Sequence, residues 1–319
     1  MERVPVGRSA LGSDVVAEYD EFSLLQENAS EVGLPWTGPP PVRREAVDVG
    51  GGRRVSALIW GPPGTTPEIV LLHGGAQNAH TWDTVALALG RPLVAIDLPG
   101  HGHSDWREDH DYTPVSNADD VAVAIRAFAP DAGMVVGMSL GGLTAFCLAQ
   151  RHPELVRKLA IIDVTPGTDH AKAEPIIAFI SGPENFASFQ EILDRTIQYN
   201  PTRTESSLRR GVLHNAHELS NGSWSWRWDP NRPSRRQGDG PEGPTVNFSP
   251  LWEAVDAVKV PLLLARGGES QVVGDEDVEE LKRRQPSARV VVVDGAGHSI
   301  QGDKPVELAR LLEEFLAPG

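Results

Sequence analysis

The sequence has little cysteine, an excess of negative over positive charge, and no long apolar run. Cys147 is the single cysteine among 319 residues, so no disulfide forms within the chain and a reducing compartment is expected. With 29 Lys and Arg against 44 Asp and Glu, the formal net charge of −15 repels nucleic acid backbones and anionic lipid headgroups. Charged residues interrupt the first 20 positions, so neither a signal peptide nor a spanning helix is predicted there. We therefore expect a cytoplasmic protein with no nucleic acid or membrane partner.

The composition and the pattern of apolar residues predict an α/β fold. Hydrophobic residues make up 40% of the chain and charged residues 23%, which is typical of a globular protein. Residues 43–163 alternate short apolar runs with helical stretches, and the alternation returns at residues 259–319. Runs such as 93–98 and 159–163 are almost continuously apolar, as in parallel strands buried on both faces. The sequence predicts a mostly parallel, twisted sheet with helices on both faces.

Each predicted element of this core has a definite range. The strands are expected at 46–49, 55–60, 69–73, 93–98, 134–138, 159–163, 261–265 and 289–293. The helices are expected around 82–89, 117–128, 140–151, 275–284 and 305–316.

Two segments fall outside the alternation. Residues 1–42 combine a helical pattern over 14–32 with a Pro-rich stretch, and are predicted to form an N-terminal arm and linker. Residues 164–258, named the insertion below, interrupt the sheet pattern. Within them we expect helices over 171–180, 185–199 and 205–218, an extended segment at 224–228 and a polar loop over 229–244. The insertion is therefore predicted to be mainly helical, between the core ranges 43–163 and 259–319.

A Gly-x-Ser-x-Gly motif carries the first indication of chemistry. Gly137-Met-Ser139-Leu-Gly141 stands where a predicted strand meets a predicted helix. A sharp turn at this point strains the serine backbone and leaves little room for side chains at the two glycine positions. A serine hydroxyl is a weak nucleophile at neutral pH and needs an adjacent base. Ser139 is therefore the predicted nucleophile.

Further motifs give the chain a resemblance to the α/β-hydrolase superfamily, in its serine esterase-like branch with a helical cap domain. They are His73-Gly74-Gly75 after the third strand, Trp82, Asp97 to Ser104 after the next strand, and Gly295-Ala-Gly-His298 after the last strand. The resemblance implies that residues 164–258 form the cap domain and that His298 is the catalytic base. It also implies an oxyanion hole made by the backbone N–H groups of Gly75 and Leu140. No cofactor is implied, and no metal is expected, because the sequence has no metal-binding motif.

The acid that orients the histidine is ambiguous. In most of the superfamily an aspartate is expected near position 270, where this sequence has Ser270, which cannot hold a negative charge. A subset of the superfamily carries the acid one strand earlier, after strand 6. Asp163, 24 residues after Ser139 and followed by Val-Thr-Pro, matches that subset. We predict Asp163 as the acid, with Glu269 and Asp275 as alternatives.

The insertion contains the candidate substrate pocket. Trp224, Trp226 and Trp228 share one face if their segment is extended, and could line a pocket or fill the core of the insertion. Trp106 and Met138 are further pocket candidates. No charged cluster is apparent, Arg227 being the one exception to test, so a small, largely neutral substrate is expected.

The predicted function is that of a serine hydrolase cleaving a carboxylic ester or lactone through an acyl-enzyme. Three alternatives keep the serine: a carbon–carbon bond hydrolase, a thioesterase, and a cofactor-free haloperoxidase or perhydrolase. A non-catalytic ligand receptor with the same fold is the rival from another class. Assembly into a homo-oligomer is left open.

Overall fold

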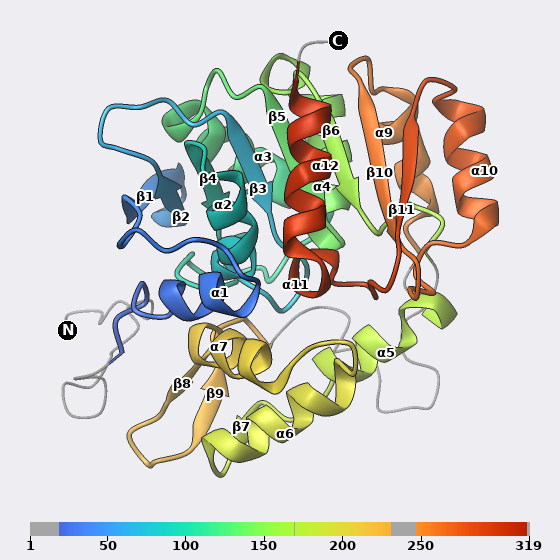
Figure 1. Cartoon of the computed structure of the whole chain (residues 1–319). Helices are drawn as coiled ribbons and strands as arrows, with labels where there is room; N and C mark the ends of the chain where they lie inside the picture. Colours follow the sequence, from blue (N-terminus) through green and yellow to red (C-terminus); the bar gives the residue numbers. More distant parts are fainter. Residues whose placement is uncertain (1–18, 169, 231–246, 318–319) are drawn as a thin grey trace.

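The computed structural model describes residues 19–168, 170–230 and 247–317, and its centre is an eight-stranded sheet (Figure 1). The strand order is β1-β2-β4-β3-β5-β6-β10-β11. β1 pairs antiparallel with β2, and β2 pairs antiparallel with β4, while all other neighbours run parallel. The strands are β1 (Val42–Gly50), β2 (Arg53–Trp60), β3 (Ile69–Leu72), β4 (Leu93–Ile96), β5 (Met134–Met138), β6 (Leu159–Ile162), β10 (Leu262–Gly267) and β11 (Arg289–Val293). The mostly parallel sheet predicted from the sequence is confirmed.

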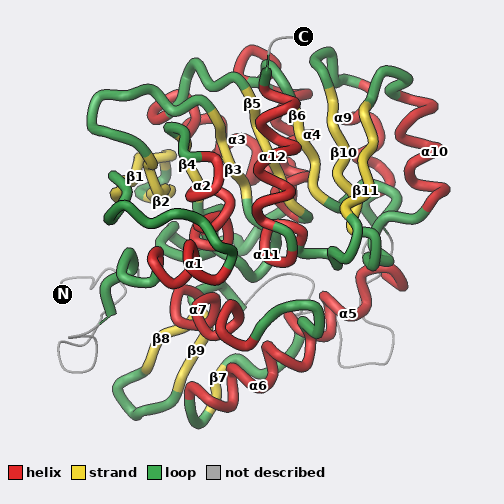
Figure 2. The backbone as a smooth tube through the Cα atoms, viewed as in Figure 1, coloured by secondary structure: helices red, strands yellow, loops and turns green. Residues whose placement is uncertain are grey.

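Helices cover both faces of the sheet, as Figures 1 and 2 show. One face carries α2 (Asp83–Leu89) and α12 (Pro305–Leu316), and the other carries α3 (Pro114–Phe128), α4 (Leu140–Arg151) and α9 (Trp252–Asp256). Side chains of each buried strand alternate between the two layers. In β3, Val70 and Leu72 pack with α3 and α4, whereas Ile69 and Leu71 pack with α2 and α12. A strand that serves two core layers must be apolar at every position, which explains the continuous apolar runs.

The insertion lies below the sheet in Figure 1, at the edge where the parallel strands end. It contains α5 (His170–Ile180), α6 (Phe189–Tyr199), α7 (Glu205–Asn215) and a small antiparallel sheet in the order β7-β9-β8. The strands of this sheet are β7 (Asn185–Phe186), β8 (Ala216–Glu218) and β9 (Trp224–Trp226). Its apolar cluster includes Ile192, Leu208 and Val212, and Ala76 of the loop after β3 joins the same cluster. The insertion therefore packs directly on that loop.

Several element boundaries differ from those predicted. The helix expected over 185–199 begins only at Phe189, because residues 185–186 pair with β9 as β7. The helix expected over 205–218 ends at Asn215, where β8 begins. Pairing with a distant strand, which a local pattern does not contain, decides these residues. The short helix α9 was not predicted, and most of the polar loop expected over 229–244 lies outside the described residues.

The N-terminal segment packs between the core and the insertion. Its helix α1 (Leu25–Glu31) is shorter than the range 14–32 that was predicted, of which residues 14–18 lie outside the described part. Leu25 is buried in the cluster of α2 and α12, and Phe22 and Trp36 pack against that cluster. On its other side, α1 contacts Arg210 of α7. None of the helices in the described ranges has the length and apolar character needed to cross a membrane.

Candidate active site

Ser139 occupies a strained turn between β5 and α4. Its backbone angles are φ 51° and ψ −118°, a conformation that residues other than glycine rarely adopt. The two flanking glycines are sterically required. A Cβ on Gly137 would lie 2.3 Å from the carbonyl oxygen of Gly141, and a Cβ on Gly141 would lie 2.4 Å from that of Leu72. The motif therefore forms the sharp strand-to-helix turn that presents the serine beyond the end of β5.

Asp163 directly follows β6, the strand next to β5, and is fully buried with a φ of 49°. Its Oδ2 atom lies 2.9 Å from Nδ1 of His298. Its Oδ1 atom accepts a hydrogen bond of 2.9 Å from the N–H of Gly267, and the hydroxyl of Ser270 donates to Oδ2. Donors around both oxygens compensate for the burial of a carboxylate. Asp163 is thus fixed in position to hold the imidazole.

The alternative acids are not in this contact. Glu269 is exposed, and the carboxylate of Asp275 is 88% exposed and forms an ion pair with Arg266. Ser270, at the position where most of the superfamily would carry the acid, donates its hydroxyl hydrogen to the acid one strand away. Sequence reasoning missed this contact, because position 270 was considered only as a missing aspartate.

His298 lies in the loop between β11 and α11 (Ile300–Asp303). Asp163 contacts its Nδ1 atom, and its Nε2 atom is buried without a hydrogen-bond partner among the described residues. An imidazole held by a carboxylate at Nδ1 keeps its proton there and leaves the Nε2 lone pair available to accept another. This is the state that a general base for a serine hydroxyl requires.

The loop after β3 approaches the serine turn. A Cβ on Gly74 would lie 2.6 Å from Sδ of Met138 and 3.2 Å from Cβ of Ser139. His73 braces this loop, because its Nε2 accepts a 2.9 Å hydrogen bond from the N–H of Leu98 and its Nδ1 lies 2.7 Å from the Gly74 carbonyl oxygen. Gly75 follows in this loop, and Leu140 opens α4, where the helix dipole favours negative charge. Their role as oxyanion donors stays a prediction.

A cavity of about 130 Å³ lies between the loop after β3 and the insertion. Its wall is about equally polar and apolar, and the polar side chains include Gln77, Asn78, Thr81, Asn200, Arg203 and Gln301. The side chain of Gln77 joins this cavity to the serine loop, because its Oε1 atom accepts a 3.1 Å hydrogen bond from the N–H of Gly74. The volume suits a short chain of a few heavy atoms.

The five predicted pocket residues have different environments. Trp226 lines the cavity, and Met138 is buried against the loop at Gly74. Trp228 is 2% exposed and stacks on Trp226 with a centroid distance of 6.1 Å, while Trp224 packs edge-on against Phe189. Trp106 is 46% exposed. Trp224 and Trp228 therefore serve the core of the insertion, which was the alternative considered for them.

Comparison with known proteins identifies the family. Residues 67–305 match the family model of the α/β hydrolase fold. The chain belongs to the α/β hydrolase family. The match runs from the start of β3 to the end of α11. It therefore includes the positions of Ser139, Asp163 and His298.

Several relatives are hydrolytic enzymes. The chain is 46% identical over 313 residues to esterase Rv0045c of Mycobacterium tuberculosis, covering 96% of this chain and 99% of that protein. A solved structure of that esterase, reported together with its transition metal inhibition, is similar with a TM-score of 0.79 and 44% identity, covering 94% of this chain and 99% of the other. A 3-hydroxybutyrate-oligomer hydrolase of Cupriavidus necator is 27% identical over 275 residues, covering 83% and 94% of the two chains. Together with the fold, these similarities identify a hydrolytic enzyme of the esterase type.

Proposed function

We propose that this hydrolase cleaves a small carboxylic ester or lactone through an acyl-enzyme formed on Ser139. The observation that carries the proposal is the contact of 2.9 Å between the buried carboxylate of Asp163 and Nδ1 of His298, whose Nε2 has no hydrogen-bond partner among the described residues. Further support comes from the strained backbone of Ser139, which directly follows β5, the strand next to β6.

The proposed reaction uses each group in two half-reactions. Ser139 Oγ attacks the carbonyl carbon while its proton moves to Nε2 of His298, and Asp163 stabilises the imidazolium. The backbone N–H groups of Gly75 and Leu140 donate to the oxyanion. The bond to the leaving oxygen then breaks, and His298 returns the proton to that oxygen. In the second half, water attacks the acyl carbon and gives a proton to His298. The bond between the acyl carbon and Ser139 Oγ then breaks, His298 returns the proton to Oγ, and the acid is released.

Uncharged hydrogen-bonding side chains such as Gln77 and Thr81 line the cavity, and Gln77 connects it to the loop beside Ser139. A small, largely neutral ester or lactone is therefore the proposed substrate class.

Labelling of the serine tests the proposal. A fluorophosphonate should add one label per chain, at Ser139, as measured by intact mass and peptide mapping. Ser139→Ala should prevent labelling and lower the hydrolysis of p-nitrophenyl butyrate by at least about 1000-fold, because the nucleophile is lost. Ser225→Ala, at a partly buried serine of the insertion, should change neither measurement. An unlabelled wild-type protein would instead favour a ligand receptor, and a Ser139→Ala variant that retains activity would overturn the mechanism.

Transition metals are reported to inhibit the M. tuberculosis esterase, and we propose that they also inhibit hydrolysis by this chain. Support comes from two histidines, His80 and His214, that line the cavity next to the serine loop.

A further inference from the structure

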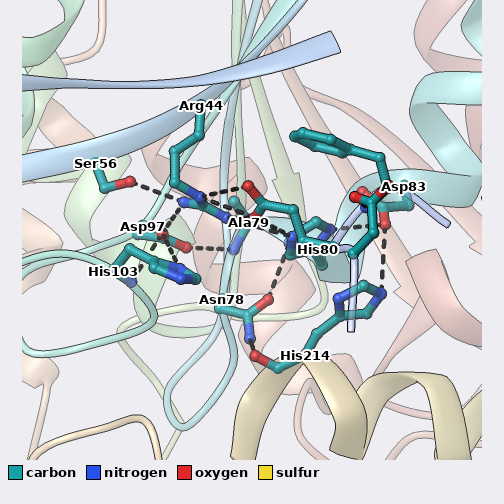
Figure 3. Close-up of polar contacts among 12 residues, drawn as sticks. Arg44, Ser56, Asn78, Ala79, His80, Asp83, Asp97, His103 and His214 are labelled. Carbon is teal, nitrogen blue, oxygen red and sulfur yellow. Dashed lines mark hydrogen bonds and ion pairs between the residues drawn. The ribbon is translucent and has the colours of Figure 1, made fainter. Parts of the chain in front are cut away.

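A buried polar cluster lies where the N-terminal segment, the start of α2 and helix α7 meet (Figure 3). His80 belongs to the short turn Ala79–Trp82, Asp83 is the first residue of α2, and His214 lies near the end of α7. All three residues are at most 7% exposed. One nitrogen or oxygen atom from each lies within 4.8 Å of those from the other two.

Two atoms of this cluster have no hydrogen-bond partner among the described residues. They are Oδ1 of Asp83 and Nε2 of His214. The other carboxylate oxygen of Asp83, Oδ2, lies 2.9 Å from Nδ1 of His80 and 3.8 Å from Nε2 of His214. A buried carboxylate oxygen and a buried ring nitrogen without partners destabilise a fold, so their presence indicates that something else satisfies them.

The N-terminal segment holds the opposite side of each imidazole. Nε2 of His80 lies 3.0 Å from a carboxylate oxygen of Glu21, and Nδ1 of His214 lies 2.5 Å from the hydroxyl of Tyr19. Histidines that bind a metal through one nitrogen usually hydrogen-bond through the other, often to a carboxylate, and this fixes the lone pair toward the metal. The carboxylate of Glu21 is such a partner for His80, and the hydroxyl of Tyr19 serves His214 when it accepts the hydrogen bond from Nδ1.

We propose that Nδ1 of His80, Nε2 of His214 and the carboxylate of Asp83 form a binding site for one divalent transition metal ion of the class of Zn²⁺, Co²⁺ and Ni²⁺. Two imidazoles and one carboxylate are ligands that these ions prefer. In a tetrahedral zinc site neighbouring ligand atoms lie about 3.4 Å apart. The distances of 2.9 and 3.8 Å bracket this value. His80 and His214 also line the cavity, which can supply a water as the fourth ligand.

Metal binding requires both rings to change their inclination. His80 and His214 are stacked, with centroids 3.9 Å apart and planes inclined by 11°. A metal lies near the plane of each imidazole that binds it, so the two rings must tilt open. His214 is the ring that moves at least cost, because its Nε2 has no hydrogen bond to break. Binding also displaces the proton between Nδ1 of His80 and Oδ2 of Asp83, since a ligating imidazole is neutral.

An occupied site would connect α7 of the insertion to the turn at residues 79–82, which follows the loop after β3. The ion and its water would also take up one end of the cavity. Inhibition of hydrolysis follows from both effects, and this consequence rests on the proposed esterase function, whereas metal binding itself does not. The expectation of no metal was based on local motifs, and these ligands come from two distant parts of the sequence.

The test measures metal binding to the full chain. Titration of the metal-free protein with Co²⁺, followed by visible absorption, should give one ion per chain with the intense bands of a tetrahedral site, and Zn²⁺ should displace it. His214→Gln should weaken binding at least about 10-fold. His217→Gln, at a half-buried histidine three positions away and outside the cluster, is the matched control and should bind as the wild type does. Zn²⁺ should raise the melting temperature of the wild type and the control by about 3 °C or more, but not that of His214→Gln.

A second variant, at Glu21, tests the metal site independently of His214. Glu21→Gln, which leaves all three proposed ligands in place but changes a partner shared by His80 and Arg44, should weaken binding about 10-fold and covers the case in which His214→Gln does not fold. Wild-type affinity in both variants, or no Co²⁺ bound to the wild type at millimolar concentration, would overturn the site. Binding without any loss of p-nitrophenyl butyrate hydrolysis would overturn the inhibition alone. A metal-free protein that hydrolyses no ester would overturn the proposed function and leave the binding measurement valid.

Discussion

Backbone strain gathers around Ser139 at the scale of single residues. Among the residues that the structure describes, four other than glycine have a positive φ: Ala76, His110, Ser139 and Asp163. Ser139 and Asp163 follow the neighbouring strands β5 and β6, and Ala76 lies in the loop after β3, which pairs with β5 on its other side. Each such conformation costs about 1–3 kcal/mol and persists only where the surroundings enforce it. Three of the four therefore lie at the ends of three adjacent strands, where the candidate active site is.

The assignment of the acid is tested by three substitutions. Asp163→Asn should lower kcat by about 10⁴ at neutral pH, because the amide favours the wrong imidazole tautomer and removes the charge that stabilises imidazolium. Ser270→Ala, which removes one donor to Asp163, and Glu269→Gln should both stay within about tenfold of the wild type. The measurement is steady-state hydrolysis of p-nitrophenyl butyrate. A crippled Glu269→Gln beside an active Asp163→Asn would contradict the assignment.

The glycines of the serine turn give a prediction about stability. Gly141→Ala should lower the free energy of unfolding by about 2–3 kcal/mol, because the new Cβ would lie 2.4 Å and 2.6 Å from two backbone oxygens that cannot move independently. Gly211→Ala is the matched control, since a Cβ there meets nothing within 4 Å inside helix α7. The control should gain about 0.5–1 kcal/mol from its higher helix propensity. Urea unfolding measures both, and equal stability of the two variants would contradict the steric argument.

At the scale of elements, the local sequence pattern predicted the bounds of those strands and helices whose apolar positions are buried in the structure. β5, α4 and α12 have the predicted bounds, because apolar periodicity and flanking turn residues agree there. β7 and β8 were predicted as parts of helices, because they become strands only through pairing with β9. The position of Asp163 could be inferred from a missing acid at 270, whereas its contact with Ser270 depends on the pairing of β6 with β10. The cluster around His80 and His214 joins elements too distant in sequence for any local pattern.

The attachment of helix α1 to the insertion gives an element-scale prediction. Arg210 is 3% exposed in its side chain and donates to Asn28 at 2.6 Å and to Glu27 at 2.8 Å, and it also pairs with Glu31. Arg210→Ala should lower the free energy of unfolding by about 2 kcal/mol, because these charge-assisted hydrogen bonds are lost while the carboxylates can still turn to water. It should also speed proteolytic cleavage between residues 20 and 40 about tenfold, as local opening of α1 becomes easier.

The neighbouring arginine supplies the control for this experiment. Arg209 is exposed on the same helix, so Arg209→Ala should leave the cleavage rate and the stability close to those of the wild type. Cleavage sites are identified by mass spectrometry. Equal cleavage rates for the two variants would show that α1 is held by its apolar contacts around Leu25 alone.

At the scale of the whole molecule, a buried carboxylate joins three distant segments. Asp97 accepts hydrogen bonds from Arg44 of β1 at 2.6 Å, from the N–H of Ala79 at 2.7 Å and from the N–H of His103 at 3.1 Å (Figure 3). Burial alone would raise the pKa of Asp97, but the guanidinium of Arg44, the neighbouring histidines and the hydrogen bonds outweigh it and hold that pKa below its ordinary value. Protonation of a buried carboxylate with such partners removes its charge-assisted contacts, so Asp97 is one of the groups through which acid destabilises the fold.

Asp97→Asn should lower the free energy of unfolding by about 3 kcal/mol at pH 7, because it leaves the buried Arg44 with one carboxylate partner fewer. A carboxyl group whose pKa is lower in the folded state stabilises the fold above its ordinary pKa, and this stabilisation disappears as the pH falls. The difference between wild type and variant should therefore be the same at pH 7 and pH 5 and should shrink below about pH 4. Urea unfolding at pH 7, 5 and 3.5 measures this difference.

Asp131→Asn is the control, at a carboxylate that is 77% exposed and paired with Arg157. It should differ from the wild type by less than about 1 kcal/mol at every pH. A difference for Asp97→Asn that is as large at pH 3.5 as at pH 7 would mean that Asp97 holds the three segments by shape and hydrogen bonding, and that its charge contributes nothing.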